Sequence, residues 1–172
     1  MKEKWKNLPA SCTLKVLFWI FTAAFLIAAL VSPDRAEMFA GLKQIYTTPA
    51  QVTKDYFEVG CVSAAFFNAF MVSALCAGLY MLPGAVANGV SFLAFSLTSG
   101  FCFWGMTLTN AIPCFLGVCL YCAVKKEPVE KNVNFMLFAT GFAPLVTDMF
   151  LRYPGLELHG FTAGSIILGV CV

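Results

Sequence analysis

The feature that most constrains this chain is a run of 66 consecutive residues, 59–124, without a single Asp, Glu, Lys or Arg. A membrane-spanning helix needs about 20 apolar residues, so this run has room for roughly three spans. Two further uncharged blocks, residues 16–31 and 133–147, lie on either side of it. The pattern predicts an all-α protein, a polytopic bundle of transmembrane helices.

The composition points the same way. Of the 172 residues, 60% are hydrophobic and 12% are charged, and that charged share is about half of the share in an ordinary soluble domain. A soluble domain of this size must cover its surface with polar groups, and a disordered chain is polar and poor in aromatic residues. The net charge is only +2, with no basic stripe to neutralise phosphates. We therefore expect the lipid bilayer as a partner and no nucleic acid.

Proline, glycine and the charges divide the chain into about five full or partial spans and a truncated sixth. We expect helices over residues 14–31, 59–82, 88–105, 110–124 and 133–151, and a sixth apolar segment from Phe161. Ser32-Pro33 and Pro83-Gly84 end the first two helices, because the residue before a proline avoids the helical conformation. A short interfacial helix is expected near residues 36–46, and Pro144 is expected to kink the fifth helix.

The basic residues predict an orientation in the cell membrane. The four Lys of residues 1–13 and 15 make the N-terminus cytoplasmic, and residues 125–132 then return to the cytoplasm after four crossings. The loop of residues 32–58 falls outside the cell. A hairpin that enters and leaves from one side would give the same result. The Lys-rich start also resembles a secretory signal peptide, although we favour an anchor that stays in the protein.

The last apolar segment, residues 161–172, is short. Its twelve residues span roughly 18 Å as a helix, against a hydrocarbon core of about 30 Å. We therefore expect residues 1–172 to be a single transmembrane domain that forms the front part of a longer chain. The alternative is a short helix that packs at the outer interface.

The second predicted helix has one face of small side chains. They recur every four residues: Cys61, Ala65, Ala69, Ser73 and Ala77. Gly60, Ala64 and Asn68 form an adjacent row. Small faces let helix backbones approach closely in lipid, so we expect this helix at the centre of the bundle. Asn68 either bonds a neighbouring helix or faces a solute path.

The region of residues 88–124 is rich in Asn, Ser and Thr. Asn110 can cap the fourth helix, and Pro113 suits a first helical turn. That helix has only about 15 residues, so with its short predecessor it forms either a discontinuous or re-entrant pair or a tight hairpin at the outer surface. If the pair is discontinuous, a solute path is lined by Asn68, Asn88, Ser99, Asn110 and Pro113.

Several other signals favour structural roles. Asp148 and Arg152 are four residues apart and form a possible ion pair at the outer end of a helix. Cys119 and Cys122 form a C-x-x-C motif without nearby ligands, and His159 is the only histidine. We expect no metal, no cofactor and no catalytic residues, because no base lies beside a nucleophile and no phosphate-binding loop is present.

Three stretches carry a shared pattern of Gly, Asn and Pro among apolar residues. They are Asp55-Tyr56-Phe57-Glu58-Val59-Gly60 leading into Phe67-Asn68-Ala69, residues 100–105 running into Asn110-Ala111-Ile112-Pro113, and Leu116-Gly117-Val118 with Tyr121. Together they resemble the N-terminal portion of an uncharacterised bacterial family of multi-pass membrane proteins, domain of unknown function 1576. The resemblance spans most of residues 45–172. Members are longer than this chain, which implies a missing C-terminal half, and the family implies no reaction.

The sequence thus predicts an integral membrane protein, not an enzyme. Our first hypothesis is a transporter or channel for a small polar solute. The alternative is a structural or assembly protein without flux, whose small helix face binds a partner helix. A homo-oligomer is a further possibility for either function.

Overall fold

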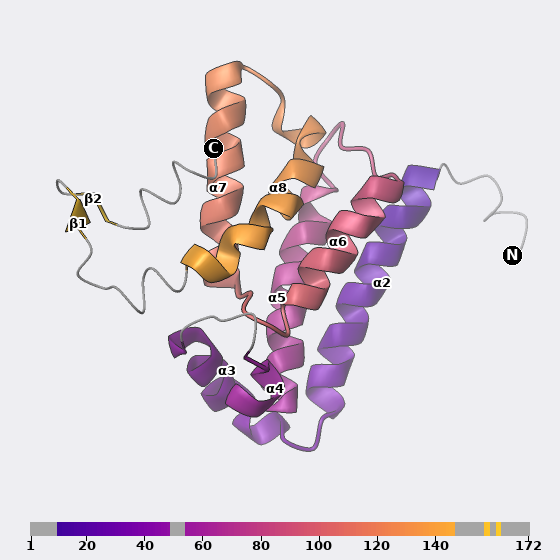
Figure 1. Cartoon of the computed structure of the whole chain (residues 1–172). Coiled ribbons are helices and arrows are strands. Elements are labelled where there is room, and N and C mark those ends of the chain that lie inside the picture. The colour runs from indigo at the N-terminus through magenta and orange to yellow at the C-terminus, as the bar shows by residue number, and fades with distance from the viewer. Residues whose placement is uncertain (1–9, 49–53, 147–156, 159–160, 163–172) are drawn as a thin grey trace, which may run out of the picture.

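The computed structural model describes residues 10–48 and 54–146, together with the backbone of two short strands farther along. Its helices are α2 (Ala10–Val31), α3 (Met38–Thr47), α4 (Tyr56–Val59), α5 (Val62–Leu79), α6 (Gly89–Phe101), α7 (Leu108–Lys125) and α8 (Val133–Ala139). Short 3-10 helices occupy Arg35–Glu37, Val129–Lys131 and Thr140–Phe142. The predicted all-α bundle is confirmed (Figure 1).

Helices α2 and α5 form the long pair of the bundle and run antiparallel (Figure 1). With 22 and 18 residues, they measure roughly 33 and 27 Å, which is close to the thickness of the hydrocarbon core. Helix α7, also of 18 residues, is the third helix that is long and apolar enough to cross a membrane. Two shorter apolar helices, Gly89–Phe101 and Val133–Val146, bring the number of full or partial spans among the described residues to five. The chain is an integral membrane protein.

Helix α3 stands where the sequence predicted a short interfacial helix. It follows the 3-10 turn at Arg35–Glu37 and, with α4, lies across the lower end of α5 in Figure 1. The second predicted helix begins later than expected, because the backbone breaks at Gly60 and Cys61 between α4 and α5. A Cβ at Gly60 would lie 2.9 Å from the Gly41 carbonyl oxygen, so only glycine allows this close approach of α3.

Helices α6 and α7 form a hairpin. Asn88, the predicted first residue of this helix, is its N-cap in a capping box with Ser91, and α6 ends at Phe101, four residues before the predicted end. Helix α7 begins at Leu108 with Thr107 as its N-cap. Two predictions are therefore wrong: Asn110 occupies the third helical position rather than the cap, and Pro113 lies inside the helix rather than in its first turn.

The reason for the longer α7 is local hydrogen bonding. The Asn110 side chain accepts a hydrogen bond from the Thr107 N–H at 2.8 Å, so the helix begins at Leu108, two residues upstream of Asn110. With 18 residues, α7 is not the short helix that the sequence suggested. The short member of the pair is α6, whose 13 residues measure roughly 20 Å.

The fifth helix starts at Val133 as predicted and continues as a helix to Val146, with a 3-10 turn at Thr140–Phe142 just before Pro144. Its predicted continuation to residue 151 and the turn at residues 153–155 lie outside the described residues, as do Asp148 and Arg152. Glu157–Leu158 and Phe161–Thr162 form a two-stranded antiparallel ladder. An extended pair thus stands where the sixth apolar segment was expected to begin, and the rest of that segment is also outside the described residues.

One end of the bundle gathers the starts of α2, α6 and α8. The Ala87 N–H donates to Ser11 Oγ at 2.9 Å, and Lys15 Nζ donates to the Ala85 carbonyl at 2.7 Å. Tyr80 OH donates to Asn134 Oδ1 at 2.7 Å, which places the loop after α7 at the same end. Lys15 and the basic loop of residues 125–132 therefore lie together.

Candidate functional site

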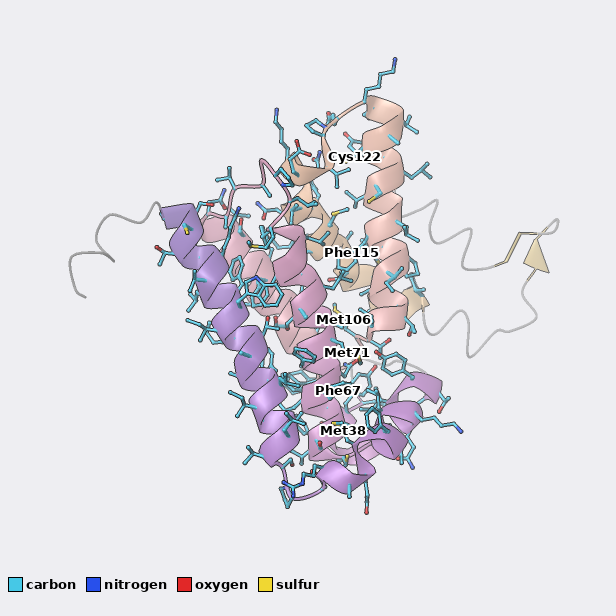
Figure 2. The ribbon with its side chains drawn as sticks, turned by 180° about the vertical axis from the view of Figure 1, so that it is seen from behind. Met38, Phe67, Met71, Met106, Phe115 and Cys122 are labelled. Atoms are coloured by element: carbon cyan, nitrogen blue, oxygen red, sulfur yellow. The ribbon has the colours of Figure 1, made fainter. Side chains whose placement is uncertain are left out.

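Most of the turn between α6 and α7, residues 102–107, is buried, although Trp104 is 44% exposed. Its backbone reverses direction at Gly105, whose φ of +83° favours glycine. The side chains of Cys102, Met106 and Thr107 are buried. In Figure 2, Met106 lies at mid-height, between Cys122 at the upper end and Met38 at the lower end. The hairpin therefore turns back within the bundle.

Asn68 of α5 holds this turn. Its Nδ2 donates to the carbonyl oxygens of Cys102 and Met106, both at 2.8 Å. Asn68 is completely buried and stands six residues into α5, roughly 9 Å from the start of that helix. One side chain thus satisfies two carbonyls that belong to no regular helix, which is what irregular backbone at this depth requires.

Asn110 secures the other side of the turn. Its Nδ2 donates to the Gly105 carbonyl at 2.9 Å while its Oδ1 accepts from the Thr107 N–H. The side chain is 2% exposed. Asn68 and Asn110, which the sequence placed on two different helices, therefore meet at the same six-residue stretch of backbone.

The segment of α3 and α4 covers the turn on the side away from α6. The Tyr56 N–H donates to the Phe103 carbonyl at 3.0 Å, and the Leu108 N–H donates to Tyr46 OH at 3.3 Å. The rings of Phe57 and Phe103 stack with centroids 5.2 Å apart. Residues of α3 and α4 therefore cover part of the turn, while Trp104 of the turn is 44% exposed.

Two polar atoms beside the turn have no hydrogen-bond partner among the described residues. They are Asn68 Oδ1 and the hydroxyl of Tyr56, and both side chains are completely buried. Burial raises the pKa of the Tyr56 hydroxyl, and Cys102 and Tyr46 raise it further, so the group stays neutral. An unpaired buried polar group costs about 1–3 kcal/mol. The turn is therefore flanked by a neutral acceptor, Asn68 Oδ1, and a neutral hydroxyl, Tyr56 OH, that no described residue bonds.

The other predicted path residues are less closely grouped. Ser99 is buried, and its Oγ lies 2.9 Å from Ser73 Oγ, one helical turn above the hairpin end. Asn88 is exposed at the opposite end of α6, eleven residues from Ser99 and so roughly 17 Å away along the helix. Pro113 is half-buried on α7 and has no hydrogen-bond contact with the turn. The structure brings together Asn68, Asn110 and Ser99, and leaves Asn88 apart.

The small face of α5 is used within the chain. Ala65, Ala69, Ser73 and Ala77 are buried, and Cys61 is half-buried at the N-cap. Helix α5 stands at the centre of the bundle, as expected, with α2 and α3 packed along it (Figure 1). This face is covered by the chain's own helices.

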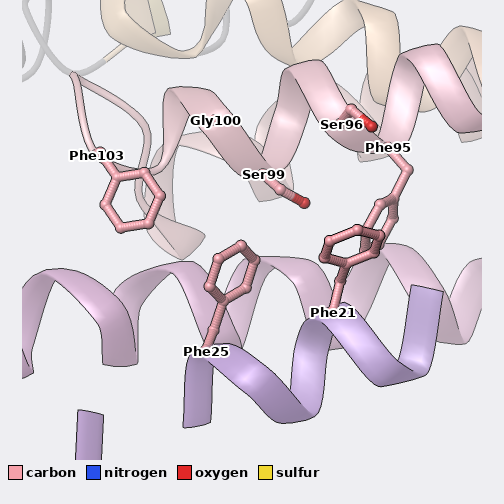
Figure 3. A pocket seen from close by; sticks show the side chains of 7 residues that line it. All are labelled: Phe21, Phe25, Phe95, Ser96, Ser99, Gly100 and Phe103. Atoms are coloured by element: carbon pink, nitrogen blue, oxygen red, sulfur yellow. The ribbon is translucent and has the colours of Figure 1, made fainter. Parts of the chain in front are cut away.

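A cavity of about 200 Å³ lies between α2 and α6. Figure 3 shows Phe21 and Phe25 of α2 facing Phe95, Ser99 and Phe103, with Ser96 and Gly100 completing the lining. Phenylalanine rings supply most of its walls, so this cavity suits an apolar group. Ser99 lies between it and the hydrogen-bonded core around Ser73.

Sequence reasoning missed Tyr56, Tyr46 and Thr107. Tyr56 stands two residues from charged Glu58, in a segment that the sequence predicted to be a polar loop. No sequence pattern relates Tyr56 to residues 102–107. The one signal was its place in the stretch Asp55–Gly60 that resembles the family. Among the described residues, no group of three or more His, Cys, Asp and Glu side chains is placed to hold a metal ion.

A comparison with known families gives one match. Residues 34–172 match the family described as "Protein of unknown function (DUF1576)". The chain belongs to this family. The match includes all of the residues that hold the hairpin turn, from Tyr46 and Tyr56 to Asn68 and Asn110. No curated protein and no solved structure matches this member of the DUF1576 family.

Proposed function

We propose that this DUF1576 protein passes a small, neutral, polar solute across a bacterial cell membrane, with its N-terminus in the cytoplasm. The observation that carries the proposal is the largely buried α6–α7 turn beside two polar atoms, Asn68 Oδ1 and Tyr56 OH, that no described residue bonds. In transporters, helix breaks at membrane depth commonly form the solute site, because their backbone groups replace part of the hydration shell.

The chemistry of the turn favours an uncharged solute. The side chains that bond its backbone are amides and hydroxyls: Asn68, Asn110 and Tyr46. A charged solute would need a counter-charge in this buried region, because an unpaired charge there is costly. A neutral solute that donates a hydrogen bond to Asn68 Oδ1 and accepts one from Tyr56 OH would give each of these two atoms a partner.

Two alternatives have less support. An assembly role was suggested by the small face of α5, but that face is covered within the chain, so Ala69 and Ser73 are poorly placed to meet a partner helix. Catalysis would need a nucleophile with a base beside it, and the thiol of Cys102 and the hydroxyl of Thr107 contact a backbone carbonyl and another hydroxyl instead. We propose that a second copy, or a further part of a longer chain, completes the path around the hairpin.

The test is solute flux in proteoliposomes that contain the purified full chain, measured as osmotic swelling with urea and with glycerol. Tyr56→Phe removes one hydroxyl and should reduce the permeability about five-fold, the factor that corresponds to one hydrogen bond of ~1 kcal/mol. Asn68→Ala should reduce it further. Tyr80→Phe is the matched control, because it removes a hydroxyl that bonds Asn134 at the far end of the bundle.

The circular dichroism of each variant checks that its helices are retained. Tyr56→Phe is the decisive variant, since its hydroxyl has no described partner to lose. If wild-type vesicles swell no faster than protein-free vesicles, or if Tyr56→Phe swells as fast as the wild type with both solutes, the proposal is wrong.

A further inference from the structure

A second, larger groove lies at the end of the bundle that carries Lys15. Its volume is about 360 Å³, which is within the range of sites for small molecules. The residues that line it come from the first half of α2 and the loop after α5: Cys12, Lys15, Val16, Trp19, Ile20 and Met81. Apart from Lys15, all of them are apolar or amphipathic. The walls of the groove are therefore apolar, because Lys15 lines it with its carbon chain, and the Lys15 ammonium lies beside the groove on the Ala85 carbonyl.

Lys15 is placed to receive an anion. It stands five residues from the start of α2, roughly 8 Å along the helix, and its ammonium reaches back toward the bundle end to donate to the Ala85 carbonyl at 2.7 Å. An ammonium has three N–H donors, so two remain. Among the described residues, no carboxylate lies within ion-pair distance of Lys15. Long basic side chains near helix ends place their charge at the interface in this way.

The rest of the groove has the character of a lipid-facing surface. Trp19, Ile20 and Met81 are 42%, 57% and 57% exposed, which in a membrane protein means contact with lipid or with a partner. Tryptophan favours the boundary between headgroups and acyl chains. The positive group and the indole ring thus lie about one helical turn apart, in the order that a phospholipid presents its headgroup and its chains.

We propose that this groove binds an anionic phospholipid, with its phosphate at Lys15 and an acyl chain along Val16, Trp19 and Met81. Charge complementarity selects the occupant, because a zwitterionic headgroup brings an ammonium toward Lys15 and an anionic one does not. Basic pockets between membrane helices recognise anionic headgroups by the same means. The proposal is independent of solute passage, since the groove lies at the far end of α2 from the hairpin turn.

The test uses the fluorescence of Trp19 in the full chain, with Trp5→Phe and Trp104→Phe removing the other two indoles. Vesicles contain mixtures of phosphatidylcholine and phosphatidylglycerol, and either lipid carries brominated chains that quench the indole on contact. The ratio of quenching gives the relative binding constant at the groove. We expect phosphatidylglycerol to be preferred about five-fold, as for one basic residue near an anionic surface.

Lys15→Gln should bring this ratio close to one, and Lys15→Arg should restore the preference. Lys125→Gln is the matched control, because it removes a charge from the same end of the bundle but not from the groove; its ratio should stay at the wild-type value. Equal quenching by the two lipids in the wild type, or a preference that survives Lys15→Gln, overturns the proposal. Weak quenching by both lipids overturns it too, since protein rather than lipid then covers Trp19.

Discussion

The carboxylate of Asp34 accepts a hydrogen bond from the backbone N–H of Val62 at 2.7 Å. The two residues are 28 positions apart, and Val62 is the first residue of α5. The Ser63 N–H also lies 3.2 Å from Asp34 Oδ1, and Ser32 Oγ donates to the same oxygen. Asp34 thus caps a helix to which it does not belong, and it ties the end of α2 to the start of α5 with a negative charge at a positive helix terminus.

This cap predicts a pH-dependent contribution to stability. The Ser32 hydrogen bond and the amides of α5 hold the pKa of Asp34 below its ordinary value of 3.8. A lowered folded-state pKa stabilises the fold above pH 3.8, and the contribution is lost as the pH falls through the folded-state value. Asp34→Ala should therefore lower the melting temperature at pH 7, and the difference from wild type should shrink below pH 3.8. Thermal unfolding followed by circular dichroism in detergent gives the melting temperatures of the variant and the wild type at each pH.

Glu37→Gln is the control for Asp34→Ala. Glu37 is exposed in the neighbouring 3-10 turn, and although it is the N-cap residue of α3, its side chain makes no capping hydrogen bond, so the melting curves of Glu37→Gln should follow the wild type at every pH. A difference between Asp34→Ala and wild type that stays constant from pH 7 to pH 3 would contradict a role for the charge.

Two glycines of the α4–α5 region should respond oppositely to alanine. A Cβ at Gly60 would meet Ile45 Cδ1 as well as the Gly41 carbonyl, both at 2.9 Å, whereas a Cβ at Gly78 meets nothing within 4 Å. Gly60→Ala should lower the free energy of unfolding by about 1–3 kcal/mol through overpacking. Gly78→Ala should leave it unchanged or raise it by up to ~1 kcal/mol, because alanine is the better helix former. Unfolding in mixed detergent micelles gives the free energy of unfolding of both variants. An equal change in the two would contradict the close approach of α3 to Gly60.

The Ser73–Ser99 hydrogen bond between α5 and α6 should be measurable as a coupling energy. A double-mutant cycle of Ser73→Ala and Ser99→Ala should give about 0.6 kcal/mol, the mean for such bonds in a membrane protein. Ser96 is exposed on the same helix, so the cycle of Ser73→Ala with Ser96→Ala should give no coupling. A null value for the first cycle would mean that the two hydroxyls do not bond in the bilayer.

The orientation can be tested by labelling with a membrane-impermeant maleimide. Glu37 and Lys125 lie at opposite ends of the bundle (Figure 1). In intact cells, Glu37→Cys should react above the wild-type background, and Lys125→Cys should react only after the cells are opened. Reaction of both from one side would contradict the spanning pair of α2 and α5. The reverse pattern would place the N-terminus outside.

Much of the fold follows from local sequence signals. The end of α2 before Pro33, the existence of helix α3, the start of α6 near Asn88 and the start of α8 at Val133 were all predictable, because apolar blocks and helix-breaking residues act over a few positions. The start of α5 was predicted too early, since Val59, Gly60 and Val62 read as one apolar run. Its break depends on the approach of Gly41 from another helix, which no local rule detects.

The site was only partly predictable. Asn68 and Asn110 stood out as polar groups in an apolar region, but their targets are backbone carbonyls at residues 102, 105 and 106, and a carbonyl has no signature in a sequence. Asn88 was grouped with them as well, because a sequence shows which residues are polar but not how far apart they lie along a helix.

By itself, the sequence determined that the chain is a membrane protein built as a bundle of apolar helices. In lipid, the backbone must satisfy its own hydrogen bonds, and the side chains that face the lipid must be uncharged. Tertiary structure alone decided where the α6–α7 hairpin turns. Only packing brings Asn68 against the turn and Tyr56 over it, since long-range contacts depend on which helix faces meet, and the free Asn68 Oδ1 and Tyr56 hydroxyl emerge only from that meeting.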